Sequence, residues 1–239
     1  MENIAQRKIG DIVATNYRTS KVFTAYNIDF CCGGGISLEK ACQKNKIDIS
    51  LIIQDLNAAL EKEDSLAYKK LALDELIDAI IQVHHKYVET TVPALLTYLD
   101  KLVKVHGERH PELFEINQLF KDGSTALLHH MKKEEMILFP YIKAMVLAKN
   151  NDFPLSKPHF GAIDNPILVM EQEHAHEGER FKVIADLTNH YKCPADACQT
   201  YKVTYAMLDE FEQDLHKHVH IENNMLFPAA RKLFSEFKF

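Results

Sequence analysis

From about residue 73 onward, apolar residues recur every three or four positions, and this spacing predicts amphipathic helices. Four long helices are expected, over about 74–105, 111–148, 166–191 and 196–234. Gly107 follows the first helix, while Pro111 and Pro166 suit the first turns of the second and third. Alternation with a period of two is scarce. The pattern therefore predicts an all-α fold, an up-down four-helix bundle.

The first 62 residues predict a separate small helical domain. A helical stripe runs from Ile9 to about Tyr26, and the glycines 33–35 then break the helix. Ser37 suits the N-cap of a short helix, and Asp48 or Ser50 can cap the next one. A charged stretch without apolar periodicity follows. The expected organisation is a helical domain at 1–62, a linker at 63–72 and the bundle at 73–239.

Two stretches share the pattern H-x3-E-x3-L-F-P, one starting at His130 and the other at His218, 88 residues later. On a helix, residues four apart lie on one face, so each stretch aims an imidazole and a carboxylate in the same direction. The carboxylates are Glu134 and Glu222. Both pairs fall within apolar stripes, where an ionised carboxylate costs several kcal/mol unless it is paired or metal-bound. One such pair suits a salt-bridged core group, but two matched pairs predict a metal site.

Proline positions predict bends in these helices. Pro93 lies inside the first helix and removes a backbone donor there. Pro140 and Pro228 end the two repeated stretches. Kinks are therefore expected just beyond the two His/Glu pairs.

The other two helices are expected to supply further ligands. His174 shares an apolar stripe of the third helix. On the first helix, spacing slightly favours His84, although His85 also touches the stripe. A competing interpretation is a ferritin-like site, because Glu171 and His174 have Glu-x-x-His spacing, but only one copy is present where that class carries two.

Four histidines and two carboxylates fit a first-row metal that accepts imidazole and carboxylate together. Zinc favours thiolates or three to four ligands, and magnesium or calcium favours oxygen. We expect two metals, iron or manganese, bridged by Glu134 and Glu222 with two histidines each. Exchangeable positions would remain for water, oxo, O2 or NO.

Composition and charge exclude several classes of protein. The chain has 28 basic and 34 acidic residues and a net charge of -6, and no Lys/Arg cluster indicates a nucleic-acid or membrane surface. The N-terminus lacks the apolar core of a signal peptide, and no apolar run reaches the ~18 residues of a membrane span. A cytoplasmic protein is expected. The odd cysteine count predicts reduced thiols at Cys31, Cys32, Cys42, Cys193 and Cys198.

These motifs closely resemble the repair-of-iron-centres family of di-iron proteins, the YtfE/ScdA type, over nearly the whole chain. The stretch from Tyr26 to Gly34 resembles the family's small domain with vicinal cysteines. The ligand motifs of the bundle are His130-x3-Glu134, Glu173-His174 and His218-x3-Glu222-Asn-Asn-x-Leu-Phe-Pro. The resemblance implies a hemerythrin-like bundle holding a non-haem, oxo- and carboxylate-bridged di-iron centre. It also selects His85 as the ligand of the first helix, eight residues before Pro93.

The family resemblance implies a role in repairing iron-sulfur clusters after oxidative or nitrosative stress, with damaged iron-sulfur proteins as clients. Iron would be donated from the di-iron centre, and NO bound or reduced there. Cys31 and Cys32 become candidates for thiol exchange or iron transfer on an accessible loop. The alternative is a half-buried pair that packs the small domain. His106 matches a family histidine near the end of the first helix. It either supports the metal site or lines a path to it; the alternative is an exposed histidine at the helix end.

Two alternatives to the repair function remain: a di-iron NO reductase that produces N2O, and a hemerythrin-like carrier or sensor of O2 or NO. The extra cysteine domain argues against a simple carrier. A two-domain chain with a linker is also compatible with a homodimer that exchanges its small domains.

Overall fold

The computed structural model describes residues 4–60 and 67–237, and within these ranges nearly all regular structure is helical. The contacts among its residues group the chain into two compact units. One unit comprises Ile77–His216, and the other comprises Met1–Leu76 together with Lys217–Phe239. Each unit is described separately below.

The four predicted long helices are present, and three of them are built from consecutive segments. The first comprises α5 (Leu73–Ile80), η3 (Ile81–His85) and α6 (Lys86–His106). The second comprises α7 (Glu112–Lys133), η4 (Glu134–Leu138) and α8 (Phe139–Asn151). The third is α9 (Asp164–Leu187), and the fourth comprises α10 (Gln199–Ile221), η5 (Glu222–Leu226) and α11 (Phe227–Phe234).

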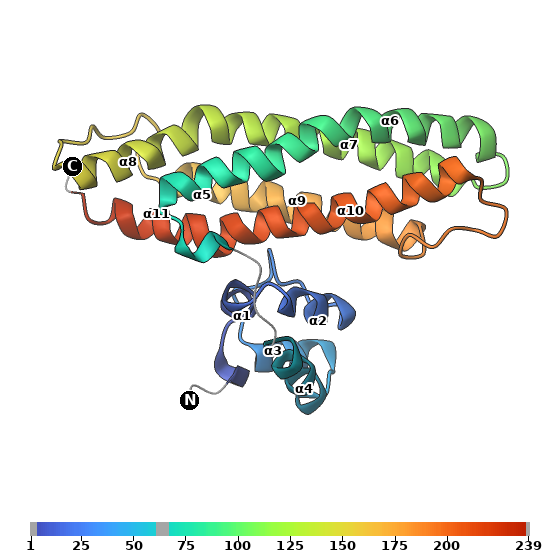
Figure 1. Cartoon of the computed structure of the whole chain (residues 1–239), viewed down its shortest axis with the longest axis horizontal. Coiled ribbons are helices and arrows are strands. Elements are labelled where there is room, and N and C mark those ends of the chain that lie inside the picture. The colour runs from blue at the N-terminus through green and yellow to red at the C-terminus, as the bar shows by residue number, and fades with distance from the viewer. Residues whose placement is uncertain (1–3, 61–66, 238–239) are drawn as a thin grey trace. The chain divides into compact units, whose positions relative to one another are not determined.

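Within the unit Ile77–His216, α6, α7, α9 and α10 as far as His216 run side by side (Figure 1). Phe211 of α10 lies at the centre of this four-helix bundle, with 1% of its surface exposed. Its ring centroid is 5.4 Å from that of Phe120 on α7, 5.5 Å from Phe181 on α9 and 6.0 Å from Tyr87 on α6. One aromatic cluster thus joins all four helices, and the prediction of an up-down bundle is confirmed.

The three segments η3, η4 and η5 are π-helical turns. In such a turn a backbone N–H bonds the carbonyl five residues back, so one extra residue is accommodated. The Phe139 N–H donates to Glu134 O, and the Phe227 N–H donates to Glu222 O. Pro140 and Pro228 follow directly and lack the N–H that an α turn would need. The distortion expected beyond each His/Glu pair therefore takes the form of a wide turn.

Pro93 behaves differently from these two prolines. The helix α6 continues through Pro93 without interruption. In the first long helix, the turn that departs from α geometry is η3, which lies before α6. Pro93 therefore does not end the first helix, and the bend expected at this residue stays a prediction.

The N-terminal helices belong to the second unit. They are α1 (Ile9–Thr15), α2 (Thr19–Ala25), α3 (Leu38–Asn45) and α4 (Ile49–Leu60). The predicted single stripe from Ile9 to Tyr26 is split, because the Asn16 side chain accepts from the Arg18 N–H at 3.0 Å and ends α1. Ser37 caps α3 by accepting from the Lys40 N–H, as predicted.

Short 3-10 turns precede and follow these helices, at η1 (Ile4–Gln6) and η2 (Ala67–Lys70). The predicted linker at 63–72 therefore contains η2, whereas its first part, 63–66, lies outside the described residues. The proposed domain limits stay a prediction.

The C-terminal segment Lys217–Phe239 packs with these N-terminal helices in one unit. The side chain of His220 packs against the rings of Tyr17 and Phe30, with centroid distances of 6.0 and 5.9 Å. Gly10 on α1 faces Asn224, and a Cβ at Gly10 would lie 2.2 Å from the Asn224 Oδ1 atom. A larger residue at position 10 would therefore require the Asn224 side chain to move away from α1.

None of the helices in the described ranges has both the length and the apolar character that crossing a bilayer requires.

The aromatic cluster generates a stability prediction. Phe211→Ala should destabilise the protein by about 3–5 kcal/mol, because it leaves a cavity among the four helices. Phe114→Ala is the matched control, since Phe114 of α7 is 57% exposed and its truncation should cost less than about 0.5 kcal/mol. Urea unfolding followed by circular dichroism measures both. Equal midpoints for the two variants would contradict the central place of Phe211.

Candidate functional site

Four of the predicted ligands lie in the unit Ile77–His216, and all four are buried: His85, His130, Glu134 and His174. The Oε2 atom of Glu134 lies 3.4 Å from His85 Nε2 and 3.4 Å from His130 Nε2. One carboxylate oxygen thus faces two imidazole nitrogens from different helices. The helix η4 begins at Glu134, so the π turn starts at this residue.

The rings of His130 and His174 meet at their Nε2 atoms, which are 2.9 Å apart. Two nitrogen lone pairs cannot face each other at this distance unless a proton or a cation lies between them. Imidazole nitrogens lie about 2.0–2.1 Å from a bound metal, so two ligands at a right angle are separated by about 2.9 Å. With Glu134, these residues offer ligand atoms within 4.8 Å of one another.

Two further carboxylates hold the outer nitrogens of these histidines. His85 Nδ1 lies 2.8 Å from Glu135 Oε1, and His130 Nδ1 lies 2.9 Å from Glu173 Oε2. Because an ionised carboxylate only accepts, each Nδ1 carries the proton and each Nε2 keeps its lone pair for the site. Histidine ligands of metals have this arrangement.

The outer carboxylates are held in their ionised form. The hydrogen bond from His130, together with the Lys133 ammonium, lowers the pKa of Glu173 to about 2, although partial burial opposes the shift. Partial burial raises the pKa of Glu135, but hydrogen bonds from His85 and Lys132 outweigh it and keep this pKa below its ordinary value. Both groups are therefore acceptors at neutral pH.

The neighbouring histidines 84 and 85 take different partners. His84 Nδ1 lies 2.8 Å from Asp214 Oδ1 on α10, whereas His85 Nε2 faces Glu134. Both histidines are buried, so burial does not distinguish them. The geometry supports His85 over His84 as the ligand.

The second His/Glu pair lies in the other unit, on α10 and η5. His218 Nε2 is 3.1 Å from Glu222 Oε1, and both residues are buried, Glu222 completely. This pair thus repeats, within one chain segment, the relation between His130 and Glu134. Each repeated stretch ends in a π turn that begins at its glutamate.

The donor chemistry of these residues suits a metal cation. Imidazole and carboxylate together are typical ligands of first-row transition metals. The buried carboxylates would otherwise carry a desolvation cost of several kcal/mol each, which a cation offsets. Both His/Glu sets meet this requirement.

The vicinal cysteines surround the carboxylate of Asp29. Asp29 Oδ1 accepts from the backbone N–H groups of Cys31 and Cys32, and Oδ2 accepts from Gly33 N–H at 2.8 Å. The Cys31 thiol donates to Asp29 Oδ1 at 3.2 Å, and the two sulfur atoms are 3.9 Å apart. Asp29, Cys31 and Cys32 form a second group of close metal donors.

The two thiols differ in accessibility. Cys31 is buried and Cys32 is half-buried, so the expectation of two accessible thiols was wrong for Cys31. The hydrogen bond with Cys32, burial and the Asp29 carboxylate raise the pKa of the Cys31 thiol. Cys31 is thus a protonated donor at neutral pH.

Sequence reasoning missed the two asparagines that follow Glu222. The side-chain amides of Asn223 and Asn224 donate to the Cys31 carbonyl at 3.3 and 3.2 Å. Their place beside Glu222 in the H-x3-E-N-N sequence was visible, but nothing in the sequence indicated the Cys31 loop as their partner. The missed Glu135 and Asp214 likewise bind through contacts between distant helices.

His106 is buried, not exposed at the helix end, and its Nε2 atom lies 3.2 Å from the Cys198 sulfur. Asp196, three residues before α10, accepts from His110 at 3.0 Å and pairs with Arg109.

Family models match most of the chain. Residues 5–60 match ScdA_N, described as a domain of unknown function, and residues 76–230 match the hemerythrin HHE cation-binding domain. Hemerythrin membership agrees with the bundle and disfavours the ferritin-like alternative.

Curated relatives align with the chain almost end to end. A probable iron-sulfur cluster repair protein of Haemophilus influenzae is 33% identical, over 95% of this chain and 98% of the relative. The iron-sulfur cluster repair protein YtfE of Enterobacter sp. is 34% identical, over 93% and 95%. The repair protein ScdA of Staphylococcus haemolyticus is 30% identical, over 92% and 95%. The chain therefore belongs to the family of the YtfE and ScdA iron-sulfur cluster repair proteins.

Proposed function

We propose that this protein repairs damaged iron-sulfur clusters by donating iron from a di-iron centre. The observation that carries the proposal is the pair of buried His/Glu sets, one with protonated Nδ1 atoms held by outer carboxylates. The relatives named as repair proteins, which match over more than nine tenths of this chain, supply the biological context.

The proposed centre has six ligands. His85, His130, His174 and His218 would hold two irons, with two histidines for each iron, and Glu134 and Glu222 would be the carboxylates that the irons share. The matched cation-binding domain, residues 76–230, contains all six. The bound irons would supply Lewis acidity and redox chemistry, with an oxo group completing the bridge. Four imidazoles and two carboxylates, without thiolate, suit a centre that releases iron to a thiol-rich client.

Small diatomic ligands fit the same centre. Six protein ligands would leave positions open on two irons, so that NO or O2 could bind there. NO binding would connect the protein to nitrosative stress. Sustained N2O production with a reductant would instead make the protein an NO reductase.

Cys31 and Cys32, with Asp29, are proposed to receive iron in transit to the client. Their three donor atoms are close enough for one ion, and a bound metal displaces thiol protons. All five cysteines are free thiols, which suits the reducing cytoplasm as the place of action. The proposed clients are iron-sulfur proteins that have lost iron.

The proposed domain limits follow the matched families. ScdA_N covers 5–60 and the cation-binding domain covers 76–230, on either side of the linker proposed at 63–72. Exchange of the small domains in a homodimer stays a prediction, and sedimentation of the full chain tests it.

Metal analysis tests the iron ligands. Protein purified without chelator should contain two irons per chain with the Mössbauer signal of a coupled pair. His130→Ala should lose this iron, whereas His129→Ala, its exposed neighbour, should keep it. His85→Ala and His84→Ala form a second matched pair, with iron lost only in the first. A single metal or zinc in the unmodified protein would contradict the bridged centre.

The outer carboxylate Glu173 generates a separate prediction. Glu173→Gln leaves all six ligands in place but weakens the support of His130, so iron affinity should fall about 10–100-fold. Glu179→Gln, six residues further along α9 and exposed, should leave the affinity unchanged. Competition with a coloured iron chelator measures both. Equal affinities would show that Glu173 does not support the site.

A repair assay tests the function itself. The iron-loaded protein should restore the activity of a [4Fe–4S] dehydratase inactivated by NO or peroxide, and His130→Ala should not. Cys31→Ser/Cys32→Ser should keep its iron but repair several-fold more slowly. Repair at the full rate would remove the thiols from the pathway, and no repair by the unmodified protein would refute the function.

A further inference from the structure

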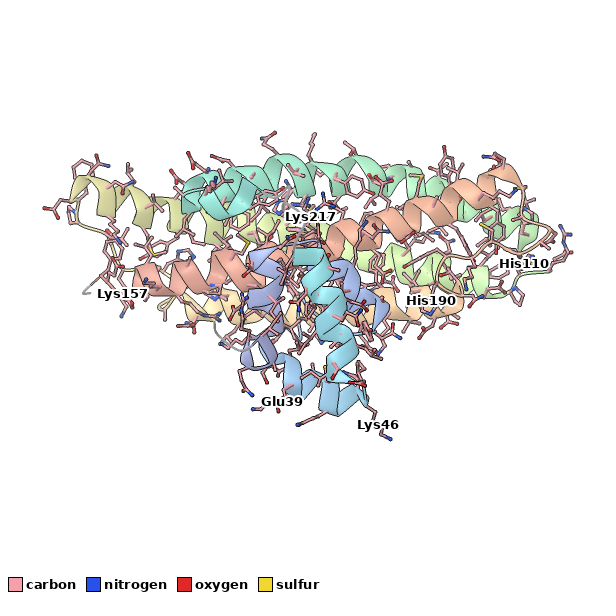
Figure 2. All side chains as sticks on the ribbon, turned by 60° about the horizontal axis from the view of Figure 1, so that its bottom comes forward. Glu39, Lys46, His110, Lys157, His190 and Lys217 are labelled. Atoms are coloured by element: carbon pink, nitrogen blue, oxygen red, sulfur yellow. The ribbon has the colours of Figure 1, made fainter. Side chains whose placement is uncertain are left out.

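A second thiol site lies at one end of the bundle, within the unit Ile77–His216. His106, near the end of α6, is 4% exposed, and its Nε2 atom lies 3.2 Å from the sulfur of Cys198. His110, whose ring centroid is 6.4 Å from that of His106, marks this end, opposite Lys157 (Figure 2). Among the described residues, His106 Nδ1 has no hydrogen-bond partner. The ring is therefore directed at the thiol.

The position of Cys198 adds a second favourable feature. Cys198 immediately precedes α10, and its carbonyl accepts from the Lys202 N–H at 3.1 Å, as expected of the first residue of the helical hydrogen-bond ladder. The N-terminal end of a helix stabilises negative charge. A thiolate at this residue would gain from both the helix and the imidazole.

Surrounding groups fix the imidazole in place. The ring of Tyr201 packs edge-on against His106 at 5.3 Å and against His110 at 5.6 Å. His110 is in turn held by Asp196 at 3.0 Å. The imidazole is thus buried and oriented, while the Cys198 residue that it faces is exposed to solvent. This combination is typical of activated cysteines.

The same loop contains a natural comparison. Cys193 is exposed like Cys198 and lies five residues earlier, but no histidine contact to it is observed in the described residues. Partial burial raises the pKa of the Cys193 thiol, which disfavours its reactive form. The two cysteines therefore differ in their chemistry, not in their access to solvent.

A metal site is a weaker interpretation of this cluster. In the described part of the chain, the groups of three or more close donor atoms include Glu134 with its histidines and Asp29 with its cysteines. The cluster of His106 and Cys198 is not among them. Activation of a thiol needs only a base and the nucleophile itself, and the distance between His106 Nε2 and the Cys198 sulfur suits that pair.

We propose that Cys198 is a peroxide-reactive cysteine activated by His106. The thiol proton passes to His106 Nε2, and the thiolate attacks one oxygen of hydrogen peroxide. The O–O bond breaks, and the departing hydroxide takes the proton from the imidazolium to form water. Cys198 becomes a sulfenic acid, so the sulfur is oxidised and the peroxide is reduced. None of these groups belongs to the proposed iron centre or to the Cys31 loop, and the site goes beyond iron donation.

Alkylation of the full-length protein tests the activation of this thiol. With limiting iodoacetamide and peptide mass spectrometry, Cys198 should react about tenfold or more faster than Cys193 in the same chain. In His106→Asn the Cys198 rate should fall to that of Cys193. After one equivalent of hydrogen peroxide, dimedone should label Cys198 in the unmodified protein and much less in His106→Asn.

The internal comparison keeps the test decisive even if His106→Asn fails to fold. Equal alkylation of Cys198 and Cys193 in the unmodified protein would overturn the proposal. An unchanged Cys198 rate in a folded His106→Asn variant would overturn the role of His106. Iron content is measured in parallel and should be the same in His106→Asn as in the unmodified protein. A lower iron content would show that His106 acts on the di-iron centre instead.

Discussion

The structure depends on the burial of carboxylates inside helices. Glu134 and Glu222 have no exposed surface, and an ionised carboxylate in such a place costs several kcal/mol unless a cation or donors surround it. This cost is offset by imidazole partners: the histidine four residues earlier in each stretch, and His85 opposite Glu134. The outer glutamates then fix the histidine tautomers, so polar groups extend from the buried carboxylate toward the surface in a defined order.

The π turns reconcile this polar site with a packed bundle. One extra residue in a turn changes which face the following residues present, so the chain can aim a His/Glu pair inward and still bury Leu138 or Leu226 afterwards. Proline two residues into the next helix prevents the turn from closing as ordinary α helix. The Leu-Phe-Pro sequence is thus part of the site's construction, although none of its residues is a donor.

Much of this could be predicted, because the relevant signals are local in sequence. The spacing of apolar residues located the four long helices within a few residues, and the repeated motif identified both buried His/Glu pairs. Contacts between distant segments could not be predicted in the same way. The choice between His84 and His85 depends on whether Asp214 or Glu134 faces each ring. Leu51 of α4 is apolar and yet 55% exposed, because the helix face that packs is set by the neighbouring elements.

The turn η5 performs two tasks with three consecutive residues. Glu222 belongs to a buried His/Glu pair, while Asn223 and Asn224 hold the backbone of Cys31. Insertion or deletion in this turn would shift all three side chains together. The Cys31 loop and the Glu222 carboxylate are therefore linked through one short turn, and any rotation of η5 would move the Cys31 backbone through these two amide hydrogen bonds.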